Sequence, residues 1–317
     1  MTVLANDGIA KSGVTALENA GYKVDLTTVA QDQLVNYINN NNVNVLLVRS
    51  ATKVRKDIID NCPSLKIIGR GGVGMDNIDV EYAREKGLHV INTPAASSHS
   101  VAELVFAHLL GMVRFLHDSN RNMPLDGDSK FKTLKKSYAK GSELKGKTLG
   151  VLGFGRIGQA TAKVALGLGM KVIAFDPFLD SANLELDFYD GQKLSFKIDT
   201  ISKDEVLQQS DFITLHVPAQ KDYVISTKEF EMMKEGVCIV NAARGGVIDE
   251  VALVTALEEQ GKVAKAALDV FEKEPTPEVQ LLMNPNLSLT PHIGAATNEA
   301  QERIGSELAS QIIEILS

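Results

Sequence analysis

Two stretches of the sequence have the glycine spacing of a phosphate-binding turn. The pattern G-x-G-x-x-G occurs at residues 69–74 and at residues 153–158, each time after an apolar run and before a helical pattern. Such glycines let the backbone approach a pyrophosphate, which then binds the free N–H groups of the helix N-terminus. A dinucleotide site also needs a carboxylate about 20 residues further on, which accepts hydrogen bonds from the ribose hydroxyls. The strand after the second copy ends in Asp176, whereas the strand after the first ends in the neutral Asn92. We therefore predict that the second copy binds a dinucleotide, and that Asp176 favours NAD because its charge would repel the 2′-phosphate of NADP.

The first glycine turn requires a different interpretation. It lies at the carboxyl end of a predicted strand, where open α/β sheets bind their ligands. We predict that the backbone N–H groups of Val73 and Gly74 bind a small anion, with Arg70 inside the same turn. The alternative is a glycine turn with no ligand.

Hydride transfer between an alcohol and NAD requires a base, a group that orients the base, and a cation that binds the substrate carboxylate. His292 follows the last predicted strand, where we expect a cleft between two domains, and we predict it to be the base. His216 ends a strand in LHVP and is expected near the cofactor in a structural role. We interpret the remaining histidines as surface or packed side chains: His89, His99, His108 and His117.

An arginine and a glutamate complete this predicted set. Arg244, in NAARGG, follows a strand and can hold a carboxylate with two parallel hydrogen bonds, although a surface arginine is the alternative. Glu272 and Glu274, in DVFEKEP, both follow the next strand. Either carboxylate could accept a hydrogen bond from the His292 ring nitrogen that points away from the substrate, which would stabilise the imidazolium. The residues alone leave the choice between the two glutamates open.

The elements that must position these residues alternate along the chain. Short β-rich runs and segments with helical spacing follow one another up to Asn92, and the alternation restarts at Lys147–Leu152. This order predicts parallel βαβ units in an α/β protein with two doubly wound parallel-sheet domains. We predict one long helix from Ser97 to Arg121, and an inserted loop or short hairpin at residues 180–201. The helical segment Asn298–Leu316 is expected to return to the first domain, which would make that domain discontinuous.

Composition limits the classes of function. The 317 residues are 44% hydrophobic and 23% charged, which is typical of a soluble protein with two domains. The net charge of −7 argues against a nucleic-acid partner, because phosphate binding needs a basic face. Cys62 and Cys238 lie in or beside apolar runs and are predicted to be free thiols, and no metal site is predicted. The apolar stretch Ala102–Leu116 is too short and too polar to span a membrane, and the N-terminus has no secretory pattern, so we expect a cytosolic protein.

These residues and their order resemble the D-isomer-specific 2-hydroxyacid dehydrogenases. The matching strings are VLGFGRIGQ, FDP, HVP, NAARGGVIDE, ALDVFEKEP and PHIGAAT. The resemblance implies a flavodoxin-like substrate domain (residues 1–96 and 296–317), a Rossmann NAD domain (residues 97–295) and a homodimer. It implies that Arg244, Glu274 and His292 are catalytic, and so selects Glu274 over Glu272. It also implies cofactor contacts at Gly153, Phe154, Gly155, Arg156, Ile157, Gly158, Asp176, His216, Val217, Pro218, Ala242, Asp269, Gly294 and Val101.

Within that family, the first domain most resembles the branch that oxidises 3-phosphoglycerate with NAD to 3-phosphohydroxypyruvate in serine biosynthesis. The strings VRSATKV, IIGRGGVGMDNID and NTPAASSHSVAELV carry this resemblance. It implies substrate contacts at Arg49, Ser50, Arg70, Val73, Gly74 and Lys136. Because the chain stops at Ser317, we expect a short form without the serine-binding domain of longer members. The alternatives are a hydroxypyruvate or glyoxylate reductase and, from another class, a non-catalytic NAD-sensing protein of the same fold.

Overall fold

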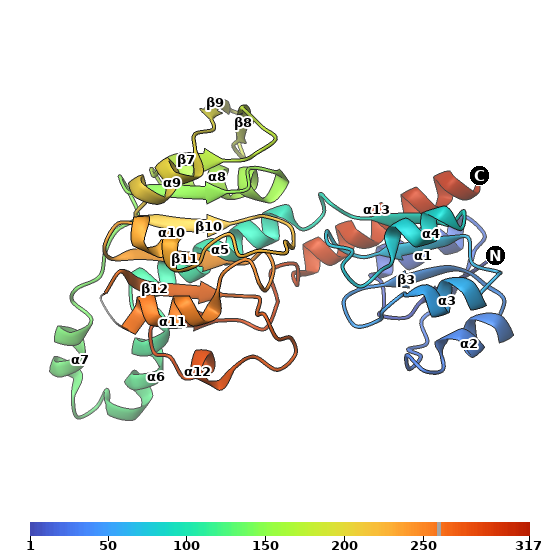
Figure 1. Ribbon diagram of the computed structural model, residues 1–317, viewed down its shortest axis with the longest axis horizontal. Coiled ribbons are helices and arrows are strands. Elements are labelled where there is room, and N and C mark those ends of the chain that lie inside the picture. The colour runs from blue at the N-terminus through green and yellow to red at the C-terminus, as the bar shows by residue number, and fades with distance from the viewer. Residues whose placement is uncertain (259–260) are drawn as a thin grey trace. The chain divides into compact units, whose positions relative to one another are not determined.

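A computed structural model describes residues 1–258 and 261–317. The chain forms two compact units (Figure 1). Unit 1 comprises residues 1–100 and 295–317, and unit 2 comprises residues 101–294. The sequence analysis had placed the two boundaries at residues 96/97 and 295/296, within a few residues of these divisions.

Unit 1 contains a five-stranded parallel sheet in the order β2-β1-β3-β4-β5. This is the flavodoxin-like order, so the predicted fold class is confirmed for this unit. The strands are β1 (Thr2–Ala5), β2 (Lys23–Asp25), β3 (Val43–Val48), β4 (Ile67–Arg70) and β5 (His89–Asn92). The helices between them are α1 (Lys11–Asn19), α2 (Leu34–Asn40), α3 (Lys56–Asn61) and α4 (Val80–Glu85).

Helix α13 (Asn298–Leu316) packs beside α1 on one face of this sheet. Its side chains Ile304, Leu308 and Ile312 recur every fourth residue and are buried against the strands, because that spacing puts them on one face of the helix. Helices α2, α3 and α4 cover the opposite face. Without α13, half of one face would expose apolar strand residues to water, which gives the C-terminal segment its reason to return to this unit.

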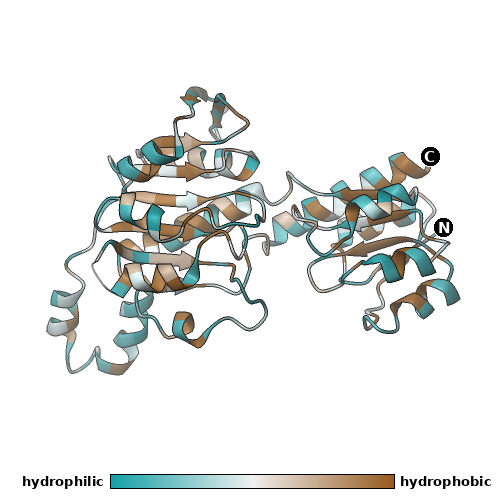
Figure 2. Cartoon of the chain, in the orientation of Figure 1, coloured by the Kyte–Doolittle hydropathy of each residue, from teal (hydrophilic) through white to brown (hydrophobic). Residues whose placement is uncertain are grey.

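Unit 2 contains a six-stranded parallel sheet in the order β13-β12-β11-β10-β6-β7. Its strands are hydrophobic along most of their length (Figure 2), as expected for a parallel sheet covered on both faces. Helices α9, α10 and α11 cover one face, and α5 and α8 cover the other. The strands are β6 (Thr148–Leu152), β7 (Lys171–Phe175), β10 (Phe212–Leu215), β11 (Val237–Asn241), β12 (Val263–Leu268) and β13 (Leu287–Leu289). The helices are α5 (Ser98–Val113), α6 (Leu116–Asp126), α7 (Phe131–Ser137), α8 (Arg156–Gly167), α9 (Lys203–Gln209), α10 (Thr227–Met232), α11 (Glu250–Glu258) and α12 (Val279–Leu282).

Residues 180–201, predicted from the sequence to be an inserted loop or a short hairpin, contain an antiparallel hairpin. Strands β8 (Ser181–Asp187) and β9 (Lys193–Asp199) pair over their full length. Leu184 is fully buried and anchors the hairpin in the core beneath α8, whereas most of β9 is exposed. Just after β9, Thr200 bridges Ala174 of β7 in parallel. The hairpin therefore ends beside β7, the outermost strand, at the position where a further parallel strand would pair with the sheet.

The prediction of one helix from Ser97 to Arg121 was wrong. The helix ends at Val113, and α6 begins after Phe115, whose φ of 55° is left-handed. The carbonyls of the last turn of α5 are bound from outside the helix, since Met112 O accepts from Lys265 Nζ and Val113 O accepts from Ser142 N. Among the described residues no single helix is long and apolar enough to cross a membrane; only α5 and α6 together pass such a test, and they are bent by 55° at the break.

Candidate active site

The six strands of unit 2 bring the predicted site residues to one edge of the sheet, because the carboxyl ends of parallel strands lie at the same edge. The residues that follow β7, β6 and β10 are the predicted dinucleotide contacts. The predicted acid–base and anion-binding groups Arg244, Glu274 and His292 follow β11, β12 and β13. The further predicted cofactor contacts Ala242, Asp269 and Gly294 follow the same three strands, so both sets share this edge.

The glycine turn after β6 is shaped by three close approaches. Gly153 has a left-handed φ of 91°, and a Cβ there would lie 2.6 Å from the carbonyl oxygen of His216. A Cβ on Gly158 would lie 2.2 Å from the Gly153 oxygen, so only glycine lets α8 begin this close to the strand. In contrast, a Cβ on Gly155 would meet open space. Gly155 is also the N-cap of α8 and makes no side-chain cap, which leaves the first helical N–H groups available to a ligand.

Asp176 holds the glycine turn from the neighbouring strand. One carboxylate oxygen accepts from the Phe154 N–H at 2.7 Å, and the other accepts from Phe178 N–H at 2.9 Å. Each oxygen retains a further lone pair, and the residue is partly exposed. The open cradle at Gly155, the uncapped helix and this carboxylate together fit the diphosphate and ribose of a dinucleotide.

His216, at the end of β10, forms part of the wall of this cradle. Its Nε2 lies 3.0 Å from the hydroxyl of Thr214, while its Nδ1 is covered and has no hydrogen-bond partner among the described residues. Burial of the ring lowers the pKa of His216 to about 3. The imidazole is therefore neutral near pH 7, which agrees with the structural role that the sequence analysis expected.

Hydrogen bonds with Asn241 hold the turn that carries Arg244 at the end of β11. Asn241 accepts from the Ala243 N–H and donates to the Arg244 carbonyl at 2.9 Å. A Cβ on Gly245 would lie 1.8 Å from the Phe271 oxygen, so this turn packs against the turn that follows β12. Arg244 is partly exposed, and one of its guanidinium nitrogens donates to the Ala243 carbonyl.

The Glu274–His292 pair expected from the sequence is present. Nδ1 of His292 lies 2.9 Å from one carboxylate oxygen of Glu274, and the other oxygen accepts from the Phe271 N–H at 3.1 Å. The two side chains are 43% and 37% exposed, so the ring's Nε2 side is accessible to a substrate. The Glu272 carboxylate instead accepts from the Glu250 N–H, and the Glu272 N–H donates to the Glu250 carboxylate. Glu272 is therefore bonded to the first residue of α11 and not to His292.

Asp269, the residue after β12, is buried, with 1% of its surface exposed. Its carboxylate accepts from the Thr290 hydroxyl and from the backbone N–H groups of Ile293 and Gly294. A Cβ on Gly294 would lie 3.1 Å from this carboxylate and 3.3 Å from Val101, so glycine allows the close contact. Ala242 is also buried, at the end of β11. Val101, Ala242, Asp269 and Gly294 thus lie at the same sheet edge as the pair.

An apolar pocket of about 430 Å³ adjoins the Glu274–His292 pair. It is lined by Phe271, Pro275, Pro277, Leu282 and Leu289. The pair therefore has hydrophobic surroundings on one side, where electrostatic interactions are less screened than in water. Within the described residues no group of three or more His, Cys, Asp or Glu side chains is arranged to hold a metal ion.

In unit 1 the first glycine turn begins at the end of β4, and Arg49, Arg70, Val73 and Gly74 of the predicted substrate contacts lie in or beside it. Neither Val73 N–H nor Gly74 N–H donates to a group among the described residues. Asn92 donates to the Val73 carbonyl at 2.7 Å. A carboxylate could not donate this bond, which explains the neutral residue at the end of β5. The turn is thus held with two N–H groups free to bind an anion.

Two arginines follow neighbouring strands beside this turn. Val48, the last residue of β3, pairs with Arg70 of β4, so Arg49 and Arg70 lie close together at the sheet edge. Asp7 accepts from the Arg49 backbone N–H. Among the residues that the structure describes, no carboxylate pairs with the Arg49 guanidinium. Ser50 is exposed beside Arg49. Lys136 is exposed on α7 of unit 2.

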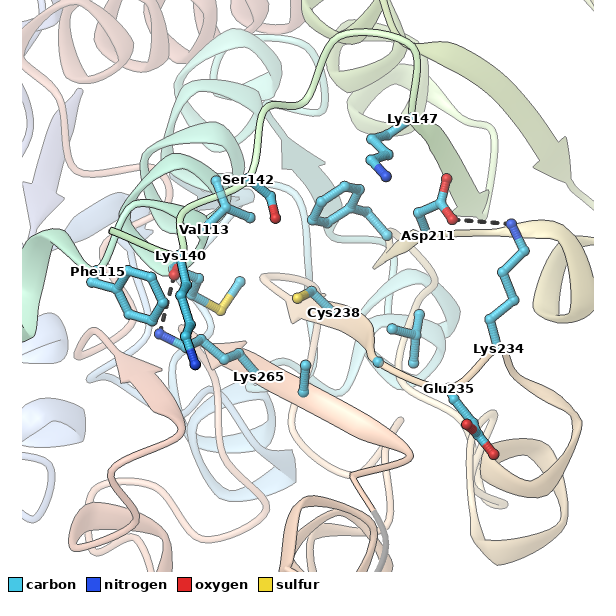
Figure 3. A pocket seen from close by; sticks show the side chains of 15 residues that line it. Val113, Phe115, Lys140, Ser142, Lys147, Asp211, Lys234, Glu235, Cys238 and Lys265 are labelled. Carbon is cyan, nitrogen blue, oxygen red and sulfur yellow. Dashed lines mark hydrogen bonds and ion pairs between the residues drawn. The ribbon is translucent and has the colours of Figure 1, made fainter. Parts of the chain in front are cut away.

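A second cavity, of about 330 Å³, lies at the amino ends of β10, β11 and β12 (Figure 3). Lysines dominate its charged lining, but Lys234 pairs with Asp211 at 3.0 Å, and Lys265 donates to Met112 O while lying over the Phe115 ring. The glycine turn lies at the opposite ends of these strands. This cavity is therefore not part of the dinucleotide cradle.

Sequence reasoning missed the polar residues that hold the turns. Thr290 and Asn241 each follow or end a strand and bond to the turn of a neighbouring strand. A polar residue in the last position of a buried apolar strand was the available signal, because a buried hydroxyl or amide needs a partner.

Comparisons with known proteins agree with this geometry. Residues 106–294 match the model of the D-isomer specific 2-hydroxyacid dehydrogenase NAD-binding domain. The chain is 45% identical to a hydroxypyruvate reductase of Thermotoga maritima, covering 99% of this chain and 98% of that protein. It is 41% identical to a D-3-phosphoglycerate dehydrogenase of Methanocaldococcus jannaschii, covering 99% of this chain and 57% of the relative.

Solved structures with the same fold include two dehydrogenases. A glyoxylate reductase from Paecilomyes thermophila matches with a TM-score of 0.80 and 31% identity, over 98% of this chain and 93% of that chain. A D-lactate dehydrogenase from Aquifex aeolicus, complexed with NAD and lactic acid, matches with a TM-score of 0.75 and 29% identity, over 100% and 95%.

Proposed function

The chain belongs to the D-isomer specific 2-hydroxyacid dehydrogenases and is an NAD-dependent enzyme of that family, and we propose that its substrate is 3-phosphoglycerate, which it oxidises at C2. The observation that carries this proposal is the pair Arg49 and Arg70 beside the glycine turn of unit 1. Two guanidinium groups at neighbouring strand ends suit a phosphate dianion, because each can form charge-assisted hydrogen bonds with its oxygens.

We assign the catalytic roles to three residues of unit 2. Nε2 of His292 takes the C2 hydroxyl proton, while Glu274 holds Nδ1 and stabilises the imidazolium that forms. Arg244 binds the substrate carboxylate and polarises the oxygen at C2. The glycine turn would hold NAD, which would supply the acceptor for the hydride that leaves C2. Asp176 orients the ribose, and the N-terminus of α8 binds the diphosphate.

Two groups of residues in unit 1 support the proposal, because a phosphorylated hydroxy acid has two anionic ends. The free N–H groups of Val73 and Gly74 suit the carboxylate end, and the arginines suit the phosphate end. Arg49 is available for this role because none of the described carboxylates pairs with its guanidinium. If Arg49 were structural, it would be expected to pair with a carboxylate of its own unit.

Hydroxypyruvate reduction is the second candidate. It is favoured by the relative with 45% identity, which matches over nearly the full length of both chains and is named a hydroxypyruvate reductase. Hydroxypyruvate carries no phosphate, so the two arginines would have no group to bind at that end.

The test compares kcat/KM for 3-phosphoglycerate and for hydroxypyruvate in Arg49→Ala and Arg70→Ala. Loss of one charge-assisted contact should cost about 1.5–3 kcal/mol with the phosphorylated substrate. The cost with hydroxypyruvate should be much smaller. Lys136→Ala tests the exposed lysine on α7 in the same way. A ratio of the two kcat/KM values that does not move in either arginine variant would favour the reductase.

We further propose that the protein is a homodimer, with α6 and α7 as contacts. Neither helix has a buried residue, and Leu125 and Phe131 are 75% and 56% exposed. Such exposed apolar side chains are typical of an interface between copies of a chain. Leu125→Glu together with Phe131→Glu should shift the mass measured by sedimentation from dimer to monomer; a wild-type monomer would contradict the proposal.

A further inference from the structure

A chain of buried polar side chains links α5 to the turn that carries His292, and the roles assigned above do not use its first members. His108 lies within α5 and has 3% of its surface exposed. Its Nδ1 lies 2.8 Å from the Ser288 hydroxyl, and its Nε2 lies 3.0 Å from the Thr290 hydroxyl. The Thr290 hydroxyl in turn lies 2.6 Å from a carboxylate oxygen of Asp269.

The chemistry of these groups fixes the direction of each hydrogen bond. A carboxylate only accepts, so the single proton of the Thr290 hydroxyl is donated to Asp269. The Thr290 oxygen must then accept from Nε2–H of His108. A neutral imidazole has one N–H, so Nδ1 is a lone pair that accepts from the Ser288 hydroxyl. Burial lowers the pKa of His108, with His117 acting in the same direction and Asp269 opposing it, so the ring is in the neutral form that this order requires.

The far end of the chain holds the backbone next to His292. Asp269 Oδ1 accepts from Thr290 and from the Ile293 N–H at 2.8 Å, and Oδ2 accepts from the Gly294 N–H at 2.8 Å. These two N–H groups directly follow His292, which has a left-handed φ of 55°. This conformation is unfavourable for a histidine, so contacts from outside the turn must maintain it.

We propose that His108 is a positioning residue for His292: the one-way chain Ser288 to His108 to Thr290 to Asp269 fixes the carboxylate that holds the His292 turn. Oδ1 of Asp269 accepts from two donors and Oδ2 accepts from one, so three hydrogen bonds hold the carboxylate in place. The chain therefore fixes the carboxylate that orients the turn carrying the base. The inference rests on the proposed role of His292 as the base.

Substitutions along the chain give the kinetic test. His108→Leu and Thr290→Val each remove one link while keeping an apolar volume similar to the original. Each should lower kcat about 5- to 100-fold, because a small misplacement of the base slows proton transfer. The double variant should be no slower than the slower single variant, since both break the same chain. His108→Gln keeps a donor and an acceptor at the same place and should restore kcat to within about threefold of the wild type.

A matched control separates positioning from stability. Met112→Ala, one turn further along α5, removes buried apolar volume and should lower Tm without changing kcat. If Met112→Ala lowers kcat as much as His108→Leu, or if the effects of His108→Leu and Thr290→Val multiply, the positioning role is overturned. The same holds if His108→Leu changes kcat by less than about twofold.

A second measurement does not depend on turnover. In ¹⁵N-histidine-labelled protein, NMR should show His108 as the Nε2–H tautomer at pH 7, and Thr290→Val should alter that signal. A protonated ring or an Nδ1–H tautomer would contradict the bond order. Because kcat can be measured with whichever 2-hydroxy or 2-oxo acid the enzyme accepts, and the tautomer with none, a wrong substrate assignment leaves this test intact. A failed test likewise leaves the substrate comparison intact.

Discussion

At the scale of single residues, the carboxylates at the carboxyl ends of the unit 2 strands have different roles, because different hydrogen-bond donors face them. Asp176 and Asp269 each follow a strand and accept backbone N–H groups, while Glu274 holds the ring of His292. The sequence predicts Asp176 at the end of a strand and Glu274 after a strand, with His292 as the partner of Glu274. The backbone partners of Asp176 and Asp269 became clear only from the turns that the neighbouring strands bring beside them.

Asp176→Ala should weaken NAD binding about 10- to 150-fold, the equivalent of about 1.5–3 kcal/mol for a lost charge-assisted hydrogen bond. The preference for NAD over NADP should fall as well, because the charge that repels a 2′-phosphate is removed. Fluorescence titration of both cofactors measures the two effects. Asp176→Asn is the matched control: it keeps an acceptor for the Phe154 N–H and should lose selectivity more than affinity. Unchanged NAD affinity in Asp176→Ala would remove this residue from the site.

Glu274→Gln should shift the acid limb of the oxidation rate to lower pH, because the imidazolium formed at His292 loses the carboxylate at 2.9 Å. The pH profile of kcat/KM for oxidation measures the shift. Glu272→Gln is the control, since its carboxylate accepts from the Glu250 N–H and does not contact His292. An acid limb that stays in place in Glu274→Gln, or moves equally in both variants, would contradict the pairing.

At the scale of elements, the hairpin β8–β9 forms where the sequence pattern predicted either an inserted loop or a short hairpin and could not decide between them. Its strands lack a regular alternation of buried and exposed residues. Almost every residue of β9 is exposed, and β8 buries a single leucine. A two-stranded hairpin is marginal by itself, so it depends on packing against the body of unit 2. Leu184 is the fully buried hairpin residue in this packing, and Ala182 and Ile198 are partly buried beside it.

Leu184→Ala should therefore destabilise unit 2 by about 2–5 kcal/mol, as expected for a fully buried leucine that leaves a cavity. Leu194→Ala, on β9 where the side chain is 52% exposed, should change the free energy of unfolding by about 1 kcal/mol or less. Urea unfolding of the two variants makes the comparison. Equal effects would show that the hairpin is not anchored through β8.

At the scale of the whole molecule, two buried histidines make stability depend on pH. Burial lowers the folded-state pKa of His216 to about 3 and lowers that of His108 as well, whereas both titrate near 6.5 in an unfolded chain. A histidine with a lowered folded pKa contributes stability that is present above about pH 6.5 and is lost as pH falls toward the folded value. The unfolded chain then binds protons that the folded chain does not.

The free energy of unfolding should therefore fall between pH 6.5 and pH 4, by at most about 1.4 kcal/mol per pH unit for each histidine. Urea unfolding at several pH values measures the slope. Carboxylates also contribute in this range, so the informative quantity is the difference between the wild type and His216→Asn. The slope should be smaller in the variant, and identical slopes would show that His216 titrates normally in the folded protein.

Much of this protein follows from its sequence by itself. Strand, helix and glycine turn are encoded by neighbouring residues, so the two parallel sheets and the cradle at residues 153–158 could be predicted, and the fold class is confirmed. The carboxyl ends of parallel strands share an edge, which is why His292, Arg244 and Asp176 could be predicted to lie along one edge of the sheet before their contacts were known.

Other features were decided only by the tertiary structure, because they depend on atoms that are far apart in the chain. The break after Val113 follows from groups at Ser142 and Lys265 that bind the last carbonyls of α5. Glu274 and Glu272 differ by two positions, yet one faces His292 and the other faces Glu250. His108 lies 180 residues from Ser288, and only folding joins them. Local spacing determines which element forms, whereas the partner of a polar side chain depends on what the packed elements place beside it.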